Sequence, residues 1–224
     1  MPARNSLKEY VKGGIYHIYN RGIDKRDIFL DERDYQTFLF FLKIYLLDKE
    51  ILETELQGTD TCKIERNNFA DEIKLLAYCL MPNHFHLMVK QNGEYSISRF
   101  MKCIATNYSM YFNKRNNRTG TLFQGRYKAV LIKEDNYLLH LSRYIHLNPL
   151  EKGLSLAKLR KHSYSSYSDY LGERHTKWVK PKIILEFFET QKDSFPGDIF
   201  SYQSFVENYE IDPKELVGKL ALED

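Results

Sequence analysis

The stretch LLAYCLMPNHFHLMVK, residues 75–90, decides the fold of this chain. Two apolar runs flank residues 81–83, a pattern that predicts a strand, a tight turn and a second strand. In the second strand His84 and His86 are two residues apart, so both imidazoles leave the same face of the strand.

Two histidines on one strand face supply half of a metal site, which needs one or two further ligands. A bare His-x-His pattern fits a second interpretation equally well, in which one ring packs against the core and the other faces water. If His84 and His86 bind a metal, we expect both to lie near the surface. Alanine at either position should then cost little folding free energy.

The segments around this pair of strands predict the order β-α-β-β-α-β-α. Strands are expected at residues 14–20, 73–80, 84–90 and 126–133, and helices at 31–49, 96–115 and 135–148. Pro149 should end the last of these helices at or just before Asn148. Gly22, in the turn after the first strand, should be free to take a positive φ, and residues 50–72 are interpreted as a loop or a frayed helix end.

This order is typical of an α+β fold, a ferredoxin-like antiparallel sheet with helices on one face. Its other face would be open to a ligand or nucleic acid. We expect this domain to span residues 1–160. Residues 161–224 should form a mainly helical C-terminal extension, with helices near 178–189 and 204–221.

Composition restricts the class of protein. The chain has 224 residues, 43% of them hydrophobic, which is enough for a core. No run approaches the roughly 18 uncharged apolar residues of a membrane span, and the N-terminus has no signal region. We therefore expect a cytoplasmic protein with no membrane partner. Cys62, Cys79 and Cys103 are widely spaced and suit reduced thiols better than disulfides.

The charge is unevenly distributed, because no acidic residue occurs between Glu94 and Glu134. The candidate DNA-binding cations in this acid-free stretch are Arg118, Arg126 and Lys128 as leading contacts, with Arg99, Lys102, Lys114 and Arg115. Aromatic residues are interleaved with them, as in proteins that bind single-stranded nucleic acid. The alternative is a solvated basic surface whose aromatic residues belong to the core.

The helix before Pro149 presents His140, Tyr144 and Asn148 at spacing i, i+4 and i+8, along one face. If that face lies over the two histidines, Asn148 can offer a third ligand oxygen and Tyr144 a hydroxyl near the metal. A dication would favour the phenolate, whose unperturbed pKa is about 10. Taken singly, Tyr144 also fits a core aromatic and Asn148 a helix C-cap.

Four motifs give a family resemblance: YHIYNRG at residues 16–22, HFH at 84–86, LFQGRY at 122–127 and RYIHLNP at 143–149. Together they resemble the single-tyrosine transposases of the HUH nuclease family, in particular the REP-associated tyrosine transposases. The resemblance covers roughly residues 10–165 and leaves the last 60 or so residues unexplained.

The resemblance implies a ferredoxin-like core that uses a divalent metal, Mg²⁺ or Mn²⁺, to cleave and rejoin single-stranded DNA at hairpin or repeat sequences. It assigns Tyr144 as the nucleophile that forms a 5′-phosphotyrosine link. The metal ligands would be His84, His86 and Asn148, the last at a place where related transposases often carry glutamine. No nucleotide cofactor is expected, and the chain acts alone or as a homodimer.

Two other functions are compatible with the residues. One is a non-catalytic module that binds single-stranded nucleic acid on the same fold. The other is a metal hydrolase of small phosphoesters that uses the two histidines.

Overall fold

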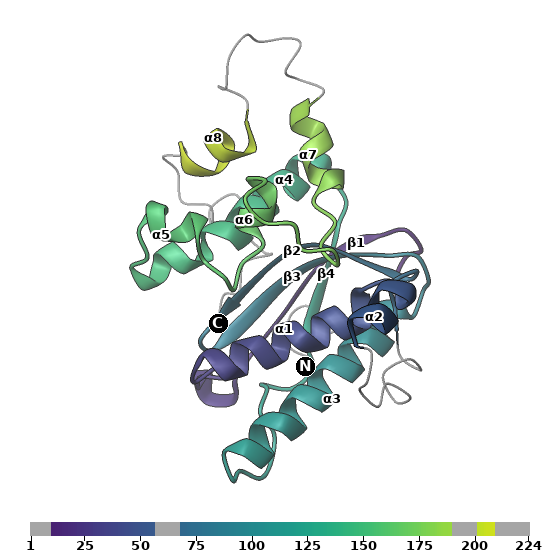
Figure 1. The fold of residues 1–224 in the computed structure, drawn as a ribbon, viewed down its shortest axis with the longest axis vertical. Helices are drawn as coiled ribbons and strands as arrows, with labels where there is room; N and C mark the ends of the chain where they lie inside the picture. Colours follow the sequence, from purple (N-terminus) through teal and green to yellow (C-terminus); the bar gives the residue numbers. More distant parts are fainter. Residues whose placement is uncertain (1–9, 57–67, 190–200, 209–224) are drawn as a thin grey trace.

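The computed structural model describes residues 10–56, 68–189 and 201–208 of the chain. Cys62 and the greater part of the helix expected at 204–221 lie outside these residues. The described elements follow the predicted order, with a short helix α2 added after α1 and four short helices after α4 (Figure 1).

Four antiparallel strands form a sheet in the order β2-β3-β1-β4. The strands are β1 Ile15–Arg21, β2 Ile73–Met81, β3 His84–Gln91 and β4 Lys128–Ile132. With β1 and β3 in the centre, this is the ferredoxin-like topology, so the predicted α+β fold is confirmed. At one edge, β2 forms isolated bridges from Cys79 to Ser165 and from Leu75 to Val179, so later segments cover its outer side.

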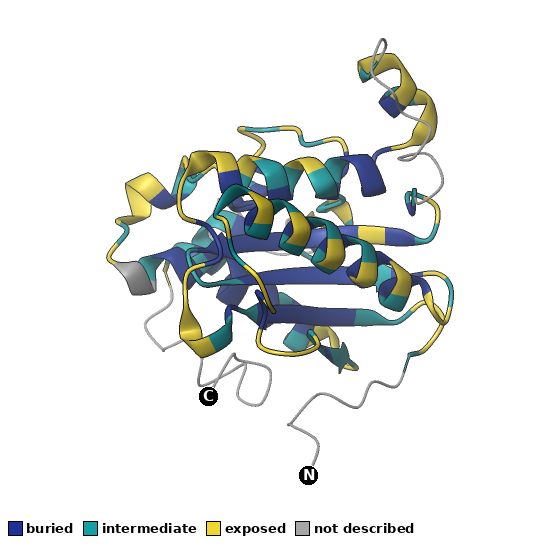
Figure 2. Ribbon diagram, turned by 90° about the horizontal axis from the view of Figure 1, so that it is seen from below, coloured by how far each residue is buried: buried dark blue, intermediate teal, exposed yellow. Residues whose placement is uncertain are grey.

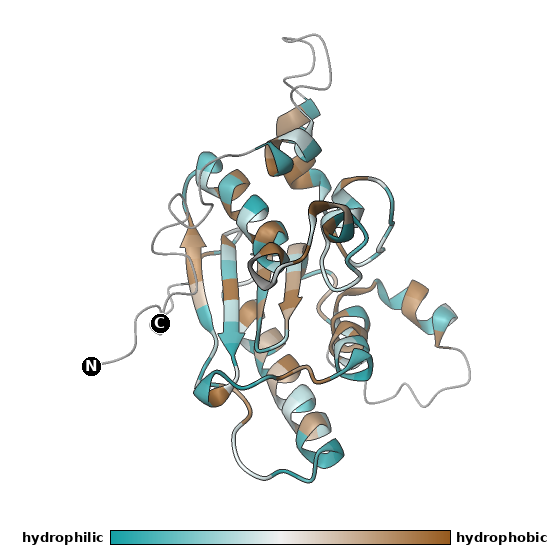
Figure 3. Cartoon of the chain, turned by 90° about the vertical axis from the view of Figure 1, so that its left-hand side faces the viewer, coloured by the Kyte–Doolittle hydropathy of each residue, from teal (hydrophilic) through white to brown (hydrophobic). Residues whose placement is uncertain are grey.

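Helices α1 (Glu32–Leu46) and α3 (Ser96–Arg115) lie side by side on one face of the sheet (Figure 1). Asp31 begins α1, because its side chain accepts a hydrogen bond from the backbone N–H three residues later. Phe38 and Tyr108 are among the residues buried against the sheet, and exposed residues follow the outer sides of the helices (Figure 2). The alternation of brown and teal along the helices in Figure 3 is the amphipathic pattern that predicts them.

The opposite face of the sheet carries α4 (Asp135–Leu147), which continues into the 3-10 helix η3 (Asn148–Lys152). A second buried cluster joins Leu76 and Cys79 of β2 to Leu141 of α4. The expectation of an open second face is therefore wrong for this part of the sheet. Since α4 brings its own apolar face, it covers β2 and β3 from the side opposite α1 and α3 (Figure 1).

Within the described residues, four short helices follow η3, and the last three of them lie in the extension expected at residues 161–224. They are α5 Leu156–Arg160, α6 Tyr167–Tyr170, α7 Lys182–Glu189 and α8 Tyr202–Glu207. Tyr170, Ile184 and Tyr202 belong to the second buried cluster, beside α4. The sequence did not predict α5 and α6. The division of the chain at residue 160 stays a prediction.

Two local expectations are corrected. The segment expected as a loop or a frayed helix end after α1 begins with a separate helix, α2, Lys49–Glu55, and residues 57–67 lie outside the described residues. Gly22 has a φ of −62°, and the positive values fall on Asp24 and Lys25 in the 3-10 helix η1, Ile23–Lys25. Glycine is nevertheless needed at position 22, because a Cβ atom there would lie 2.1 Å from a backbone oxygen.

Candidate metal and tyrosine site

His84 and His86 lie on the same face of β3, with their ring centroids 5.0 Å apart, as the sequence predicts. This is the face that carries α4, because Met88, the next residue on it, belongs to the second buried cluster. His84 is partly exposed, whereas His86 is fully buried at 0% exposure. The expectation that both histidines lie near the surface is therefore wrong for His86, which α4 and β1 enclose.

The end of α4 brings Asn148 to His84. Helix α4 ends at Leu147, just before Pro149, as expected, and Asn148 is its C-cap. The Oδ1 atom of Asn148 lies 3.1 Å from Nε2 of His84, and Oδ1 of Asn83 lies 2.7 Å from Nδ1 of the same ring. A neutral imidazole has one N–H and can donate to only one of these two oxygens. The other contact is satisfied when the Asn148 amide turns over and donates from Nδ2, or when a cation binds both Nε2 of His84 and Oδ1 of Asn148.

His17 on β1 contacts the ring of His86. Its Nε2 atom lies 2.8 Å from Nδ1 of His86, and both residues are fully buried with nearly parallel rings. The Nε2 atom of His86 has no hydrogen-bond partner in the described structure. Burial, and to a smaller extent His84 and His17, lower the pKa of His86 well below 6.5. The ring is therefore neutral near pH 7, the form that binds a metal.

Tyr144, on α4, packs against the same pair of rings. Its ring centroid is 5.4 Å from that of His86 and 6.3 Å from that of His17, edge-on to both. Tyr144 is 4% exposed and Asn148 is 2% exposed, so His84 is the most accessible member of the group. The structure thus brings together the four residues that the sequence singles out for the chemistry.

The donor set of this group is two imidazole nitrogens and one amide oxygen. Within the described part of the chain, no three His, Cys, Asp or Glu side chains gather to hold a metal ion. His84, His86 and Asn148 fit a first-row divalent ion nevertheless, since imidazole and carbonyl oxygen are ligands for such ions and His86 has an unpartnered nitrogen.

His140 does not join this group. Its Nδ1 atom accepts a hydrogen bond from Arg143 at 2.5 Å, and its ring lies beside Phe205 of α8. Of the three residues spaced along this helix face in the sequence, only Tyr144 and Asn148 reach the histidines.

The predicted DNA-binding cations lie on the two opposite faces of the sheet. Lys128 pairs in register with Tyr19, which in turn pairs with His86, so Lys128 lies on the face of the sheet that carries the histidines. Arg21, which the sequence analysis did not single out, pairs in register with His84 on that face. The sequence feature that could have identified Arg21 is its place in the YHIYNRG motif, directly before the final glycine. Arg126 is exposed and precedes β4.

The remaining cations lie on or next to α3, across the sheet from the histidines. Arg99 forms an ion pair with Glu72, and Arg115 pairs with Asp31 and Asp34. Arg118 donates a hydrogen bond to Asn113. The exposed side chains among them are Lys102 and Lys114, with Arg99. DNA contact at these five positions stays a prediction, and the geometry of the histidine site gives it no support.

The aromatic residues of the acid-free stretch are mostly core residues. Phe100, Tyr108, Phe112 and Phe123 are buried in the cluster between α1, α3 and the sheet. The alternative interpretation, in which the aromatic residues belong to the core, therefore holds for these four: α3 turns the first three inward, and Phe123 packs edge-on against Phe85 of β3.

Comparisons with known proteins agree with this arrangement. Residues 47–148 match the family model described as IS200-like transposase. A search of curated proteins found no match. Among solved structures, the chain is similar to a REP-associated tyrosine transposase bound to a REP hairpin, with 16% identity, 78% of this chain and 90% of that chain covered, and a TM-score of 0.51. It is also similar to a candidate transposase from Deinococcus radiodurans R1, with 14% identity, 65% and 95% covered, and a TM-score of 0.36.

None of the helices in the described ranges is long and apolar enough to cross a membrane.

Proposed function

We propose, from the match of residues 47–148 to the IS200-like transposase family model, that this chain is a metal-dependent endonuclease and strand transferase acting on single-stranded DNA. The observation that carries the proposal is the convergence of His84, His86, Asn148 and Tyr144 from β3 and α4. All four residues lie within the matched range and on one chain. A homodimer is therefore not needed to supply any of them.

His84, His86 and Asn148 would hold the metal, either Mg²⁺ or Mn²⁺. When bound, such an ion polarises a phosphodiester and stabilises the charge that develops on it. Two imidazole ligands favour Mn²⁺ over Mg²⁺, because nitrogen is a softer ligand than oxygen. Without an ion, the Asn148 amide can turn over so that Nδ2 donates to His84.

His17 is a positioning residue in this proposal. A hydrogen bond from Nδ1–H of His86 to Nε2 of His17 leaves a lone pair on Nε2 of His86, as a metal ligand requires. The opposite tautomer would place an N–H on Nε2 of His86, where it would point at the metal and block its binding. A bound metal would therefore fix the 2.8 Å contact in the direction from His86 to His17.

Tyr144 is the proposed nucleophile. Its phenolic oxygen loses its proton to solvent and bonds to phosphorus, the bond from phosphorus to the 3′ oxygen breaks, and that oxygen takes up a proton. The products are a 5′-phosphotyrosine link and a free 3′-OH. Because the link keeps the energy of the broken bond, attack by another 3′-OH can rejoin a strand without a nucleotide cofactor.

The proposed partner is single-stranded DNA that carries a hairpin or repeat. The structural neighbour of similar fold is bound to a REP hairpin. Arg21 and Lys128 flank the histidines on their sheet face, where they can contact phosphates next to the break.

The test is the covalent adduct. Labelled single-stranded DNA from the flanks of the gene, incubated with the protein and Mn²⁺, should give a complex that survives denaturation, with the DNA on Tyr144 by mass spectrometry. Tyr144→Phe should abolish the adduct and retain DNA binding, which separates the proposal from a non-catalytic binding module. Tyr19→Phe is the matched control, because the Tyr19 ring lies 6.1 Å from that of His86. Recovery of the DNA on Tyr19 would contradict the assignment, and cleavage without an adduct would indicate a metal hydrolase.

A further inference from the structure

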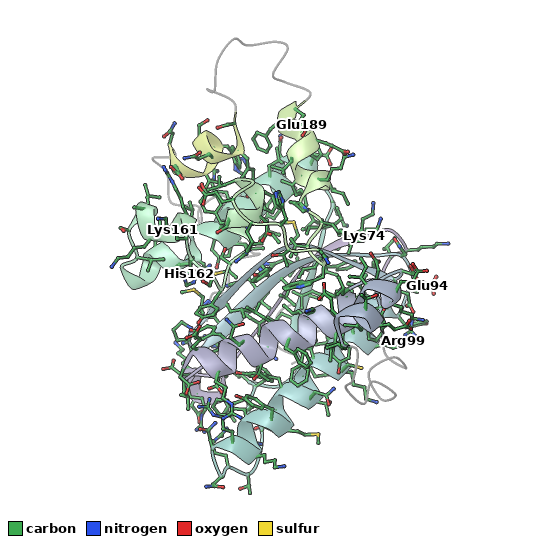
Figure 4. All side chains as sticks on the ribbon, in the orientation of Figure 1. Lys74, Glu94, Arg99, Lys161, His162 and Glu189 are labelled. Carbon is green, nitrogen blue, oxygen red and sulfur yellow. The ribbon has the colours of Figure 1, made fainter. Side chains whose placement is uncertain are left out.

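A basic cavity lies between α5 and the segment that leads into α6. Its volume is about 720 Å³, and its lining includes Lys158, Arg160, Lys161, His162 and, as the acidic member, Glu173. Figure 4 shows Lys161 and His162 next to each other on this side of the molecule. These cations follow the acid-free stretch in the sequence, and none of them was singled out there.

Two of the cations are available to a ligand. Arg160 is held by Glu207, through two hydrogen bonds to the carboxylate. Lys158 and Lys161 are exposed, and neither forms an ion pair with a residue in the described ranges. His162 also lines the cavity, and its buried Nε2 atom has no hydrogen-bond partner in the described structure. The cavity therefore offers two exposed ammonium groups and the ring of His162, whose Nε2 atom is itself buried.

The wall of this cavity is connected to the candidate metal and tyrosine site through β2 and through η3. The carbonyl oxygen of Tyr164 accepts a hydrogen bond from the backbone N–H of Leu80, and the next β2 residue, Met81, pairs with His84. On the other side, Leu154 lines the cavity just after η3, the 3-10 helix that begins at Asn148. A DNA strand that leaves the histidine site along the β2 edge of the sheet would therefore reach the cavity next.

The lining indicates the chemistry of the ligand. Lysine ammonium groups bind phosphates, and aromatic rings bind unstacked bases. Tyr164 lines the cavity, with Tyr35 stacked on one face of its ring at 4.0 Å and His162 packed perpendicular to it at 5.6 Å, so a base would pack against the part of the Tyr164 and His162 rings that faces the cavity. A cavity of this size holds a ligand of roughly one or two nucleotides, not a duplex.

We propose that the cavity bounded by Lys158, Lys161, His162 and Tyr164 binds the single-stranded DNA next to the scissile phosphate. This inference rests on the proposed function, because it names where the cleaved strand continues. The two lysines neutralise its phosphates, and Tyr164 and His162 contact a base.

The first experiment compares two double charge reversals. Affinity for a fluorescent single-stranded oligonucleotide is measured by anisotropy at several salt concentrations for the wild type, K158E/K161E and K74E/K182E. Lys74 and Lys182 are exposed control lysines, and Lys74 lies at the opposite side of the molecule from Lys161 in Figure 4. Far-ultraviolet circular dichroism verifies that each variant is folded.

K158E/K161E should weaken binding at least about tenfold and reduce the slope of log K against log salt by roughly 1.4, for two lost contacts to a single strand. K74E/K182E should change affinity less than about twofold by comparison, and a fully paired duplex should not distinguish the two variants. Equal losses of single-strand affinity in both variants, or a K158E/K161E variant that loses as much affinity for duplex as for the single strand while K74E/K182E does not, would overturn the proposal. So would a wild type that does not bind the oligonucleotide.

A second experiment locates the strand. Oligonucleotides with 4-thiothymidine at successive positions around the break are crosslinked by light, and the crosslinked peptides are identified. Crosslinks to residues 158–164 from positions next to the break are expected, and crosslinks confined to α3 would overturn the proposal. Adduct formation at Tyr144 is measured separately from crosslinking. The absence of an adduct would reject the proposed function, whereas the crosslinks alone decide whether DNA lies in the cavity.

Discussion

At the scale of single residues, the contact between His17 and His86 sets the chemistry of the site. His17→Leu removes the acceptor that holds Nδ1–H of His86, so we expect Mn²⁺ affinity to fall roughly 10- to 100-fold. His17→Gln should lose less, because its amide oxygen can accept the same hydrogen bond. Isothermal calorimetry measures the affinity, and ¹⁵N spectra of the histidine rings report whether Nε2 of His86 lacks a proton.

The matched control for this prediction is His140→Leu. His140 lies on the helix of Tyr144 but bonds to Arg143 and not to the histidine pair. Its removal should leave Mn²⁺ affinity unchanged. An equal affinity for wild type and His17→Leu would show that His17 has no part in binding the metal.

The two histidines of β3 should differ in what they contribute to folding. His86→Ala removes a fully buried ring, which we expect to lower the free energy of unfolding by about 2 kcal/mol or more. His84→Ala removes a partly exposed ring and should cost less than about 1 kcal/mol. Urea denaturation in EDTA measures both values without a contribution from bound metal. Equal costs would mean that His86 is not enclosed as the structure has it.

The sequence predicts the residues of this site better than their surroundings. His84 and His86 share a strand face because of a two-residue spacing, and Tyr144 and Asn148 share a helix face because of a four-residue spacing. Both relations are local. His17 contacts His86 across 69 positions of sequence, through the register of β1 on β3, which no local spacing contains. The burial of His86 also depends on α4, whose position over the sheet is a tertiary property.

At the scale of elements, α8 and the segment before α6 fix α4 through a buried histidine. Nδ1 of His146 lies 2.7 Å from the hydroxyl of Tyr202, and Nε2 lies 2.8 Å from the hydroxyl of Ser166. The Tyr202 hydroxyl donates onward to Ser142, so this chain of hydrogen bonds suits a neutral imidazole. It joins α4, which carries Tyr144, to the extension.

This network predicts a pH dependence of stability. Burial lowers the pKa of His146 from 6.5 to about 3. Between these pH values the imidazole is therefore protonated in the unfolded chain but stays neutral in the folded protein. The contribution of His146 is fully present above pH 6.5 and is lost as the pH falls toward 3. Between pH 7 and pH 5 the loss should be about 2 kcal/mol in the free energy of unfolding.

Urea denaturation of wild type and His146→Gln in EDTA at both pH values isolates this contribution. Glutamine does not titrate, so the variant should lose about 2 kcal/mol less than the wild type over this range. The other histidines contribute equally to both proteins. If both proteins lose the same free energy, His146 does not carry the pH dependence.

The elements themselves follow from the sequence wherever they are long. The helices α1 and α3 have apolar stripes over three or more turns, and Pro149 ends α4 by removing a backbone donor. The helices α5 and α6 have five and four residues, which is too short for a helical period to show. Their buried side chains Leu159, Tyr167 and Tyr170 belong to the second core, and this packing stabilises them where their own propensity does not.

At the scale of the whole molecule, the sheet separates two cores with different roles. One core joins the sheet to α1 and α3, and its residues form a scaffold away from the histidines. The other joins the same sheet to α4 and the extension, and Tyr144 is one of its members. The proposed nucleophile therefore lies in a layer that both halves of the chain build.

This arrangement predicts that residues 161–224 do not act as a separable domain. A chain ending at residue 160 would lack Tyr167, Tyr170, Ile184 and Tyr202, and would expose the apolar residues of β2 and α4 that they cover. It would also leave β2 as an unprotected edge strand, because Ser165 and Val179 bridge to it. We expect this shortened chain to aggregate or to unfold without a cooperative transition.

A chain ending at residue 208 is the control, because it keeps every contact described for the second core. It should unfold in one cooperative transition, as should the full-length protein, when heating is followed by circular dichroism and by light scattering. A chain ending at residue 160 that stays monomeric and unfolds cooperatively near the midpoint of the full-length protein would show that the first core suffices. In that case α4 would be held by the sheet alone, and the extension could be removed without loss of the site at Tyr144.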